Sequence, residues 1–431
     1  MRKRGIVWFR SDLRLHDNEA IFEAINHVKE LLYVYVFDER VFLGKTKYGF
    51  RKTEKYRSKF IIQSIHNLRQ NLKERGCRLI VRVGKPELIL PEICKESDSS
   101  WIFCNRERTS EEKYVQDELE KNLWSIGREV RFCRGKMLYY TSDLPFPITH
   151  TPDTFSAFRK EVEKFVPVRK PLPTADIEIP DSRFKIEDGE IPDLSDFGFT
   201  DEEQKFDPLL LGGESAGLHE MNYYLWDSNL VSTYKETRNG LLGRDYSSKF
   251  SAYLSAGCLS PKLVAHQVFS YEKERNKNES TYWLVYELMW RDFFRLMGKK
   301  YENSIFQLGG IQQRSDVNSE EDMEAFEKWS SGNTGVPFVD ANMTELNETG
   351  FMSNRGRQNV ASYLVNDMKL SWLLGASYFE SLLIDYDPCS NYGNWNYIAG
   401  VGNDPRTDRY FNIETQAKKY DPEGMYIKKW S

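Results

Sequence analysis

The first third of the chain alternates short apolar runs with longer amphipathic stretches. The apolar runs have the length and the Val, Ile and Phe content of buried strands, and they lie at 6–9, 31–37, 79–83, 101–104 and 130–132. Between them, apolar positions recur at helical spacing over 18–29, 55–75, 86–96 and 110–126. This order predicts an α/β domain over residues 1–133, in which helices cover both faces of an open, Rossmann-like sheet of five parallel strands.

The pattern changes after residue 133. Residues 134–205 are rich in Pro, Asp, Glu and Ser, which is typical of a long connecting segment that runs over the surface. From 206 to 431 the apolar positions follow helical spacing only, and the stretches 281–297 and 358–379 each carry one apolar stripe. The sequence therefore predicts an inter-domain linker over 134–205 and an all-α second domain over 206–431.

Size and composition agree with two domains in a reducing compartment. A chain of 431 residues exceeds what one core usually fills. Its 6 cysteines form no CxxC pair, so nothing indicates a zinc site or a disulfide framework. No apolar run has the length of a signal peptide core or a membrane span. We expect a cytoplasmic monomer without a metal site or membrane contact, and the net charge of −5 argues against a general nucleic-acid-coating protein.

The chemistry is expected in the second domain. No Gly-x-Gly-x-x-Gly motif follows the first strand, so the first domain lacks the dinucleotide fingerprint. The last hundred residues instead contain a cluster of polar side chains close to aromatic ones. Its members are Asn354, Arg355, Arg357, Asp385, Asp387, Asn391 and Trp395. Ordinary cores avoid polar groups that would lack partners. The cluster predicts a pocket for a polar, planar, electron-accepting ring beside tryptophans, which is a flavin site.

Two earlier stretches favour the same pocket more weakly. Residues 245–251 are expected to open a helix that ends near Gly257, and hydroxyls and N–H groups at such a start suit a phosphate, although capping serines are usually structural. Glu287 lies one helical turn before Trp290 and Arg291. These three residues form either an exposed ion pair beside a core indole, or a cavity rim from which Arg291 reaches a bound phosphate or ring.

With these residues the chain resembles the photolyase/cryptochrome family, and most closely its DASH-type cryptochromes. The resemblance begins at the family's opening signature, Trp8 to Asn18, and covers nearly the whole chain. The segments most specific to the DASH branch are 234–240, 353–360 and 400–406, and a further match lies at 420–424.

The resemblance implies FAD, bound in a U shape within the helical domain. The side chains that would meet its pyrophosphate and ribityl chain are Tyr234, Ser247, Ser248 and Ser251, and those that would line the same cavity are Arg291 and Asn354. Arg357 would pair with Asp385 beside the isoalloxazine, and Asp387 would lie at the ring edge. Asn391 would face flavin N5, where a carboxamide can either accept or donate a hydrogen bond.

The family also implies a route for electrons to the flavin. Trp395 and Trp372 match the first two tryptophans of that route. Where other photolyases place the third, at the surface, this chain has Ser319. We therefore expect the final step to use Trp329 or a tyrosine, unless the alignment of this loop is shifted.

The substrate implied by the resemblance is damaged DNA, mainly single-stranded. Gln358 and Tyr397 replace a methionine and a tryptophan of other dimer-repairing photolyases, and the DASH branch shares both changes together with a preference for lesions in single strands, where base flipping costs less. The lesion would lie over the flavin, with Glu287 bonded to the carbonyl region of the dimer. Further DNA contacts are expected from Trp290, Arg355, Arg406 and Arg409.

A second chromophore is suggested by residues 105–112, which resemble the DASH folate-antenna segment. Glu107 would then contact the pterin of methenyltetrahydrofolate. The residues themselves leave a folate, a deazaflavin and no antenna all open.

The expected function is thus blue-light-dependent repair of cyclobutane pyrimidine dimers, chiefly in single-stranded DNA. One rival is a photoreceptor that signals through a protein or RNA partner; its relatives usually extend beyond the photolyase-like core, whereas this sequence ends at 428–431. Another is an electron-transfer flavoprotein without a light function. That alternative assigns no role to Glu287, Trp290 and the basic residues Arg355, Arg406 and Arg409.

Overall fold

The first part of the chain forms the predicted sheet. The computed structural model describes residues 4–174, 184–404 and 409–431. Its five strands all pair in parallel, in the order β3-β2-β1-β4-β5, and are β1 (Arg4–Phe9), β2 (Glu30–Asp38), β3 (Leu79–Gly84), β4 (Trp101–Asn105) and β5 (Glu129–Cys133). The central strands β1 and β2 are buried on both faces, as their unbroken apolar runs require. The predicted α/β class is confirmed.

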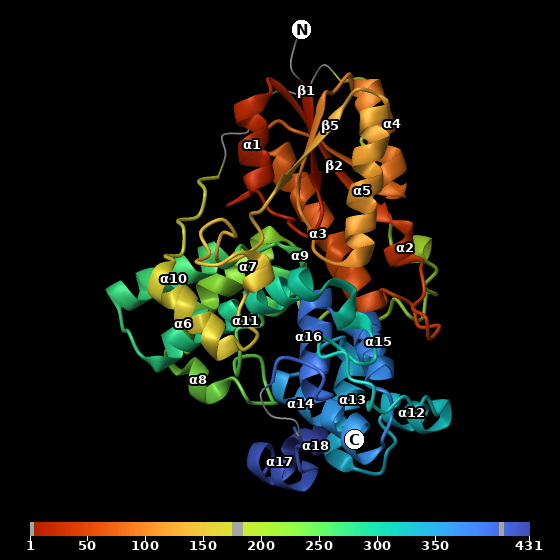
Figure 1. Ribbon diagram of the computed structural model, residues 1–431, viewed down its shortest axis with the longest axis vertical. Helices are drawn as coiled ribbons and strands as arrows, with labels where there is room; N and C mark the ends of the chain where they lie inside the picture. Colours follow the sequence, from red (N-terminus) through yellow and green to blue (C-terminus); the bar gives the residue numbers. More distant parts are fainter. Residues whose placement is uncertain (1–3, 175–183, 405–408) are drawn as a thin grey trace.

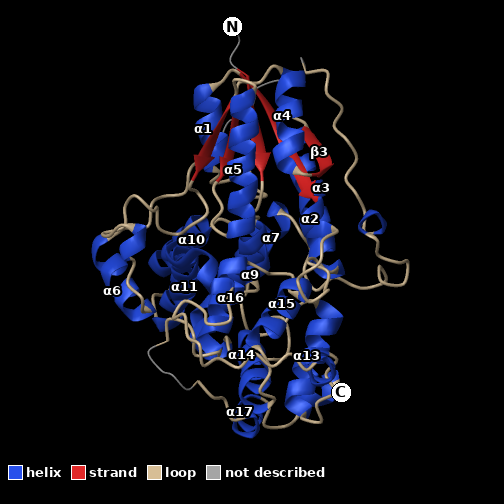
Figure 2. Ribbon diagram, turned by 45° about the vertical axis from the view of Figure 1, so that its right-hand side comes forward, coloured by secondary structure: helices blue, strands red, loops and turns tan. Residues whose placement is uncertain are grey.

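Helices cover both faces of this sheet (Figures 1 and 2). The connecting helices are α1 (Glu19–His27), α2 (Glu39–Phe42), α3 (Lys55–Lys73), α4 (Pro86–Ser97) and α5 (Ser110–Ser125). Apolar side chains of α1 and α3 share one core with one face of the sheet, whereas those of α4 and α5 pack with the other face. The sheet and its helices lie above the helical half in Figure 1, and the C-terminus lies in the lower part of the helical half.

The linker contains more regular structure than the sequence predicts. Its helix α6 (Phe155–Phe165) begins at the capping residue Thr154 and buries Phe155, Phe158 and Val162. Two short 3-10 turns, η1 (Ile148–His150) and η2 (Ser195–Phe197), also lie within 134–205. The apolar spacing of α6 is helical, but the prolines on either side of it favoured an irregular segment. The expectation that the segment lacks regular structure was therefore wrong at α6, whose apolar side packs on α11 (Glu279–Tyr301).

Part of the same linker follows the edge of the sheet. The Val81 N–H in β3 donates to the Asp188 carbonyl at 2.7 Å. Three arginines, Arg69, Arg78 and Arg82, donate to further backbone carbonyls between 184 and 189. The linker thereby covers the outer side of β3.

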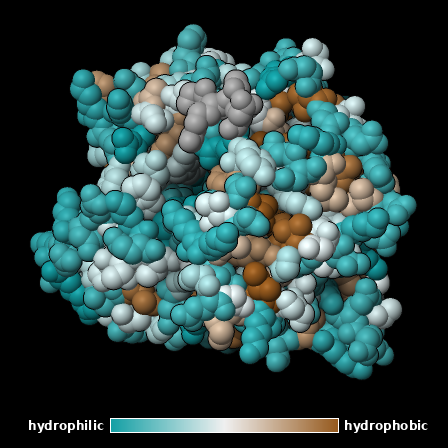
Figure 3. Space-filling model, turned by 90° about the horizontal axis from the view of Figure 1, so that it is seen from below, coloured by the Kyte–Doolittle hydropathy of each residue, from teal (hydrophilic) through white to brown (hydrophobic). Residues whose placement is uncertain are grey.

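The described residues after 206 form helices and loops, as predicted. In addition to α11 they are α7 (Glu214–Asn222), η3 (Tyr223–Asp227), η4 (Leu230–Thr233), α8 (Tyr234–Thr237), α9 (Phe250–Ala256), α10 (Pro261–Glu274), η5 (Glu302–Phe306), α12 (Met323–Ser330), α13 (Pro337–Thr349), α14 (Asn354–Ser362), η6 (Tyr363–Asp367), α15 (Trp372–Leu382), α16 (Pro388–Ile398), α17 (Ile413–Tyr420) and α18 (Met425–Trp430). Figure 3 views this half from below and shows apolar side chains grouped near the middle of a mostly hydrophilic face.

Two predicted helices have different bounds in the structure. The stretch 358–379 is not one helix, because α14 and η6 end before Lys369, which has a φ of +54°, and α15 begins at Trp372. The break is held by the Ser371 N–H, which donates to the Glu320 carbonyl at 2.7 Å. The helix expected from residue 245 begins only at Phe250 in α9, because the residue before it, Lys249, also has a positive φ of +55°.

Candidate functional site

The start of α14 places an arginine beside a buried carboxylate. The Ser353 Oγ accepts the Gly356 N–H and so caps the helix. One residue later, the Arg357 Nη2 lies 2.9 Å from the Asp385 Oδ2, and its Nε donates to the Met352 carbonyl. The structure therefore contains the Arg357–Asp385 ion pair that the sequence predicted.

Asp385 also offers an unused acceptor. Its Oδ1 is buried and has no hydrogen-bond partner among the residues that the structure describes. A buried polar atom without a partner costs on the order of 1–3 kcal/mol, and more when it is charged. A planar ring with an N–H group next to Arg357 would satisfy this oxygen, so these residues fit a flavin.

Two further polar residues lie at the start of α16. The Asp387 Oδ1 accepts the Ser390 N–H at 2.8 Å, and its Oδ2 lies 3.1 Å from the Arg295 Nη1. Burial alone would raise the pKa of Asp387, but Arg295 and Arg291 hold it below its usual value. One turn later the Asn391 Nδ2 donates to the Ala376 carbonyl, which fixes the carboxamide and leaves its Oδ1 for a ligand.

The residues predicted for the pyrophosphate come from α8 and from the loop and first turn of α9. Tyr234 and Ser248 are buried, Ser247 is half-buried, and Ser251 is exposed. None of the three serine hydroxyls makes a hydrogen bond within the described parts of the chain, so all three remain available to a ligand. The side chain of Asn354, at the start of α14, is also exposed. Their contacts to FAD stay predictions.

Arg291 and Glu287 do not pair with each other. The Arg291 guanidinium donates to the carbonyls of Lys136 at 2.8 Å and Leu254 at 3.0 Å, so it ties α11 to α9 and to the segment after β5. The Glu287 Oε1 lies 2.7 Å from the Arg238 Nη2 instead. The alternative of an exposed Glu287–Arg291 ion pair is therefore wrong, and the phosphate or ring contact of Arg291 stays a prediction.

The turn that follows α8 binds two of the residues expected at the lesion, Glu287 and Arg355. Arg238 pairs with Glu287, and its neighbour Asn239 accepts a hydrogen bond from the Arg355 Nη2 at 3.0 Å. The Arg355 Nη1 donates to the Gln358 Oε1 at 2.8 Å. Arg238 and Asn239 were not predicted as site residues, although both lie in the 234–240 motif.

The aromatic residues expected at the lesion also meet. The rings of Trp290 and Tyr397 lie 5.8 Å apart at 89°, and the Arg409 guanidinium lies 4.6 Å from the Tyr397 ring. Arg409 also pairs with Asp404. Phe155 of α6, which the sequence analysis missed, stacks on Trp290 at 3.8 Å between centroids. Arg406 lies outside the described residues.

The tryptophans of the expected electron route are buried. Trp395 is 2% exposed and packs so closely on Gly375 that a Cβ there would lie 2.2 Å from its ring. The Trp372 Nε1 donates to the Leu308 carbonyl at 2.9 Å. Ser319 is exposed in the loop whose Glu320 carbonyl binds the start of α15. Trp329 is fully buried, with its ring 6.4 Å from that of Trp395.

Glu107 belongs to a buried ionic cluster that joins the two halves of the chain. One of its carboxylate oxygens pairs with Lys136, and the other lies 3.0 Å from the Arg295 Nη2. Arg295 continues the cluster to Asp387. Burial alone would raise the pKa of Glu107, but the charges of Lys136 and Arg295 lower it to about 2. Glu107, which was expected to contact a pterin, thus already has both carboxylate oxygens in ion pairs.

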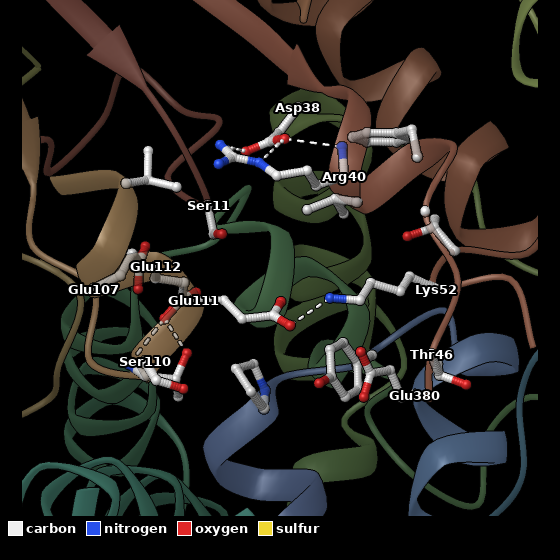
Figure 4. A pocket seen from close by; sticks show the side chains of 18 of the residues that line it. Ser11, Asp38, Arg40, Thr46, Lys52, Glu107, Ser110, Glu111, Glu112 and Glu380 are labelled. Carbon is white, nitrogen blue, oxygen red and sulfur yellow. Dashed lines mark hydrogen bonds and ion pairs between the residues drawn. The ribbon is translucent and has the colours of Figure 1, made fainter. Parts of the chain in front are cut away.

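A cleft of about 1130 Å³ lies between the sheet and the helical half (Figure 4). Its lining combines residues of both halves, among them Trp8, Lys52, Glu107, Glu380 and Tyr392. Figure 4 shows Glu111 and Lys52 pointing toward each other across it, and their charged groups lie 2.5 Å apart. The lining does not include Arg357, Asp385 or Asn391, so the cleft and the flavin-side residues are two separate places.

The described residues offer neither a metal cluster nor a membrane-spanning helix. Within 4–174, 184–404 and 409–431, no group of three or more His, Cys, Asp or Glu side chains could hold a metal ion. No helix in the same ranges is both long and apolar enough to span a bilayer.

Comparison with known proteins agrees with this geometry. Residues 5–176 match the DNA photolyase family, and residues 283–431 match the FAD binding domain of DNA photolyase. Cryptochrome DASH of Gloeobacter violaceus is 46% identical over 99% of this chain and 85% of its own length, and the chloroplastic/mitochondrial cryptochrome DASH of Arabidopsis thaliana is 45% identical over 99% and 75%.

Solved structures give the same result. A cryptochrome from Synechocystis sp. superimposes with a TM-score of 0.94 at 45% identity, over 100% of this chain and 89% of that chain. An archaeal photolyase from Sulfolobus tokodaii with two FAD molecules has a TM-score of 0.80 at 27% identity, over 99% and 90%. The cofactor of this chain is FAD, and the chain belongs to the photolyase/cryptochrome family, as one of its DASH-type cryptochromes.

Proposed function

We propose that the chain repairs cyclobutane pyrimidine dimers in DNA under blue light, mainly in single strands. The observation that carries the proposal is that three helices each hold one residue predicted for the flavin side and one predicted for the lesion side. Helix α11 supplies Arg291 and Trp290, α14 supplies Arg357 and Arg355, and α16 supplies Asn391 and Tyr397. Because α11 and α14 both contact α16, a lesion held by the second set lies beside a ring held by the first.

The roles that we propose for the domains are those that the sequence predicts. We assign residues 1–133 to an antenna domain, 134–205 to the linker and 206–431 to the FAD-binding catalytic domain. FAD, when bound, reduced and excited by light, supplies the electron that splits the dimer. The protein's own task is to hold the lesion next to it.

The lesion-side residues have the chemistry for this task. The faces of Trp290 and Tyr397 can stack on bases, and Arg355 and Arg409 can meet phosphates. Glu287 lies beside them in its pair with Arg238, and burial raises its pKa although Arg238 opposes this. Phe155 stacks on one face of Trp290, and the indole as a whole is half-buried.

Single strands should be repaired better than duplexes. Extruding a dimer from a duplex costs a few kcal/mol, which corresponds to a preference on the order of tenfold or more. Gln358 and Tyr397 offer less apolar contact than the methionine and tryptophan they replace, and so recover less of that cost. The measurement is repair of one defined dimer under blue light, in matched single-stranded and duplex oligonucleotides, with binding measured over a range of salt concentrations.

Variants separate the roles of the rim residues. Glu287→Ala and Trp290→Ala should impair repair by about tenfold or more while FAD content stays near that of the parent, because both face the lesion. Trp124→Ala is the control, since this tryptophan is 72% exposed in the other domain. Equal repair of both substrates contradicts the strand preference. If neither substrate is repaired with the flavin fully reduced, the photoreceptor alternative is favoured.

FAD should be bound without a covalent link, one per chain. Asp385→Asn removes the charge opposite Arg357, and loss of a hydrogen bond to a charged group, about 1.5–3 kcal/mol, should weaken FAD binding by at least about tenfold. Asp316→Asn, in an exposed pair with Arg314, should leave it unchanged. The measurement is the mass and amount of flavin released by denaturation. Recovery of FMN would contradict the assignment.

For a second chromophore we propose the cleft between the two halves. Aromatic residues such as Trp8, Tyr386 and Tyr392 line it, and its volume suffices for a pterin or a larger ring system. The pairing of Glu107 within the ionic cluster means that a folate would have to share this carboxylate with Lys136 and Arg295. The mass of any second compound in the same denatured extract distinguishes a folate, a deazaflavin and no antenna.

A further inference from the structure

Tyr392 lies next to Trp372, the second tryptophan of the expected electron route. It belongs to α16, one turn before Trp395, and its ring lies 6.3 Å from that of Trp372 at an angle of 75°. The side chain is largely buried, yet it lines the cleft between the two halves, which solvent can enter. Tyr392 therefore connects the second tryptophan of the route to a space that soluble reductants can reach.

The phenol of Tyr392 is bonded to a base. Its hydroxyl donates to the Glu380 Oε2 of α15 at 2.9 Å. Glu380 also lines the cleft, and Figure 4 shows it on the same side as Lys52. Burial raises the pKa of Glu380 despite the opposing effects of Tyr392, Arg57 and Lys52. A carboxylate in this position can accept a proton, which a phenol must lose when it is oxidised near neutral pH.

The other candidates lack such a base. Ser319 cannot be oxidised by a tryptophan. Trp329 leads to Tyr378, whose ring lies 6.1 Å away, but the Tyr378 hydroxyl donates to the Asn347 Oδ1 at 2.7 Å and lies 3.3 Å from the Ser330 carbonyl. Amide and carbonyl oxygens do not take up a proton under these conditions.

We propose that Tyr392, with Glu380 as its proton acceptor, is the last electron donor of the tryptophan route. The proposal rests on the proposed function, since it needs a flavin that light can reduce. When Trp372 has lost an electron, Tyr392 gives it one, and the phenolic proton moves to the Glu380 carboxylate. The indole is restored, Tyr392 becomes a neutral radical, and Glu380 becomes a neutral acid. A soluble thiolate that enters the cleft then gives one electron to the Tyr392 radical and becomes a thiyl radical, while Glu380 returns the proton to the phenol.

The test follows the radicals. After a flash on the FAD-loaded protein, the parent should show a short-lived tryptophan radical and then a tyrosyl radical by transient absorption and electron paramagnetic resonance. The second step should be slower in heavy water. Tyr392→Phe should abolish the tyrosyl signal and lower the yield of long-lived reduced flavin by about tenfold or more. Glu380→Gln, which keeps the shape but not the base, should slow the formation of the tyrosyl radical.

Control measurements keep the outcomes distinct. Tyr378→Phe should leave both radicals unchanged, and the FAD content of every variant should match that of the parent, while melting curves measure the stability that each lost hydrogen bond costs. A tyrosyl signal that survives in Tyr392→Phe, or that disappears in Tyr378→Phe, overturns the proposal. A parent that reduces its flavin through tryptophan radicals alone overturns it too, but leaves the proposed function intact. If light does not reduce the parent's flavin at all, the electron route itself fails.

Discussion

Glu107→Gln should lower the free energy of unfolding by about 3–5 kcal/mol, the usual cost of breaking a buried ion pair. The carboxylate is nearly inaccessible and serves both Lys136 and Arg295, whose side chains are also buried. The neutral amide keeps the size of the side chain but removes the counter-charge of Lys136 and leaves Arg295 with only that of Asp387. Equilibrium denaturation should show the loss as a lower midpoint. The control is Glu118→Gln, which removes an exposed pair with Lys121 and should cost less than about 1 kcal/mol.

The size of this loss should depend on pH. Because the folded-state pKa of Glu107 is about 2, below its usual value of 4.5, the stability gained from the ionised group is fully present above pH 4.5. It is lost as the pH falls from 4.5 toward 2. The difference between the parent and Glu107→Gln should therefore shrink over this range. A difference that is constant from pH 7 to pH 3 would mean that Glu107 is not ionised in the folded protein.

Trp395→Phe and Trp372→Phe should each suppress the light-driven reduction of the flavin by more than about tenfold. Phenylalanine keeps most of the packing but is much harder to oxidise than an indole. Neither side chain belongs to the group around Arg357 and Asp385, so FAD content should change little. The measurement is the visible spectrum during illumination with a thiol reductant.

The two tryptophan variants have a matched control. Trp124→Phe makes the same substitution at an exposed position in α5 and should reduce its flavin at the parent's rate. Loss of the Trp372 Nε1 bond to the Leu308 carbonyl should cost stability on the order of 1 kcal/mol, which a melting curve can separate from the electron-transfer effect. An unchanged rate in Trp372→Phe would show that electrons reach Trp395 by another path.

The strands were predicted well because their signal is local. Each strand of the sheet is a short apolar run bounded by polar residues, and the five predicted runs all lie inside strands of the structure. Helix α6 and the break at Lys369 were not predicted, because prolines hide the first and a continuous apolar stripe hides the second. In both places the outcome depends on contacts with distant residues, such as the bond from Ser371 to Glu320.

The candidate site also contains contacts that the sequence predicts and contacts that it does not. Pairing of Arg357 with Asp385 could be predicted from motifs, since each residue belongs to a segment that resembles the family's. Pairing of Glu107 with Lys136 and Arg295 could not be predicted, because three segments far apart in the sequence have to meet in one buried place. Phe155 was missed for a similar reason: nothing near it in the sequence indicates that it stacks on Trp290.

The linker's course along β3 bears on solubility. The free edge of a sheet is a template on which another chain can add a strand, and exposed edges therefore promote aggregation. At β3 the backbone around Asp188 and the arginines that bind residues 184–189 occupy this edge. The opposite edge, β5, has a different protection, because its exposed positions carry the charged side chains of Glu129 and Arg131. Residues 184–189 of the linker thus leave less of the β3 edge open to a strand from a second molecule.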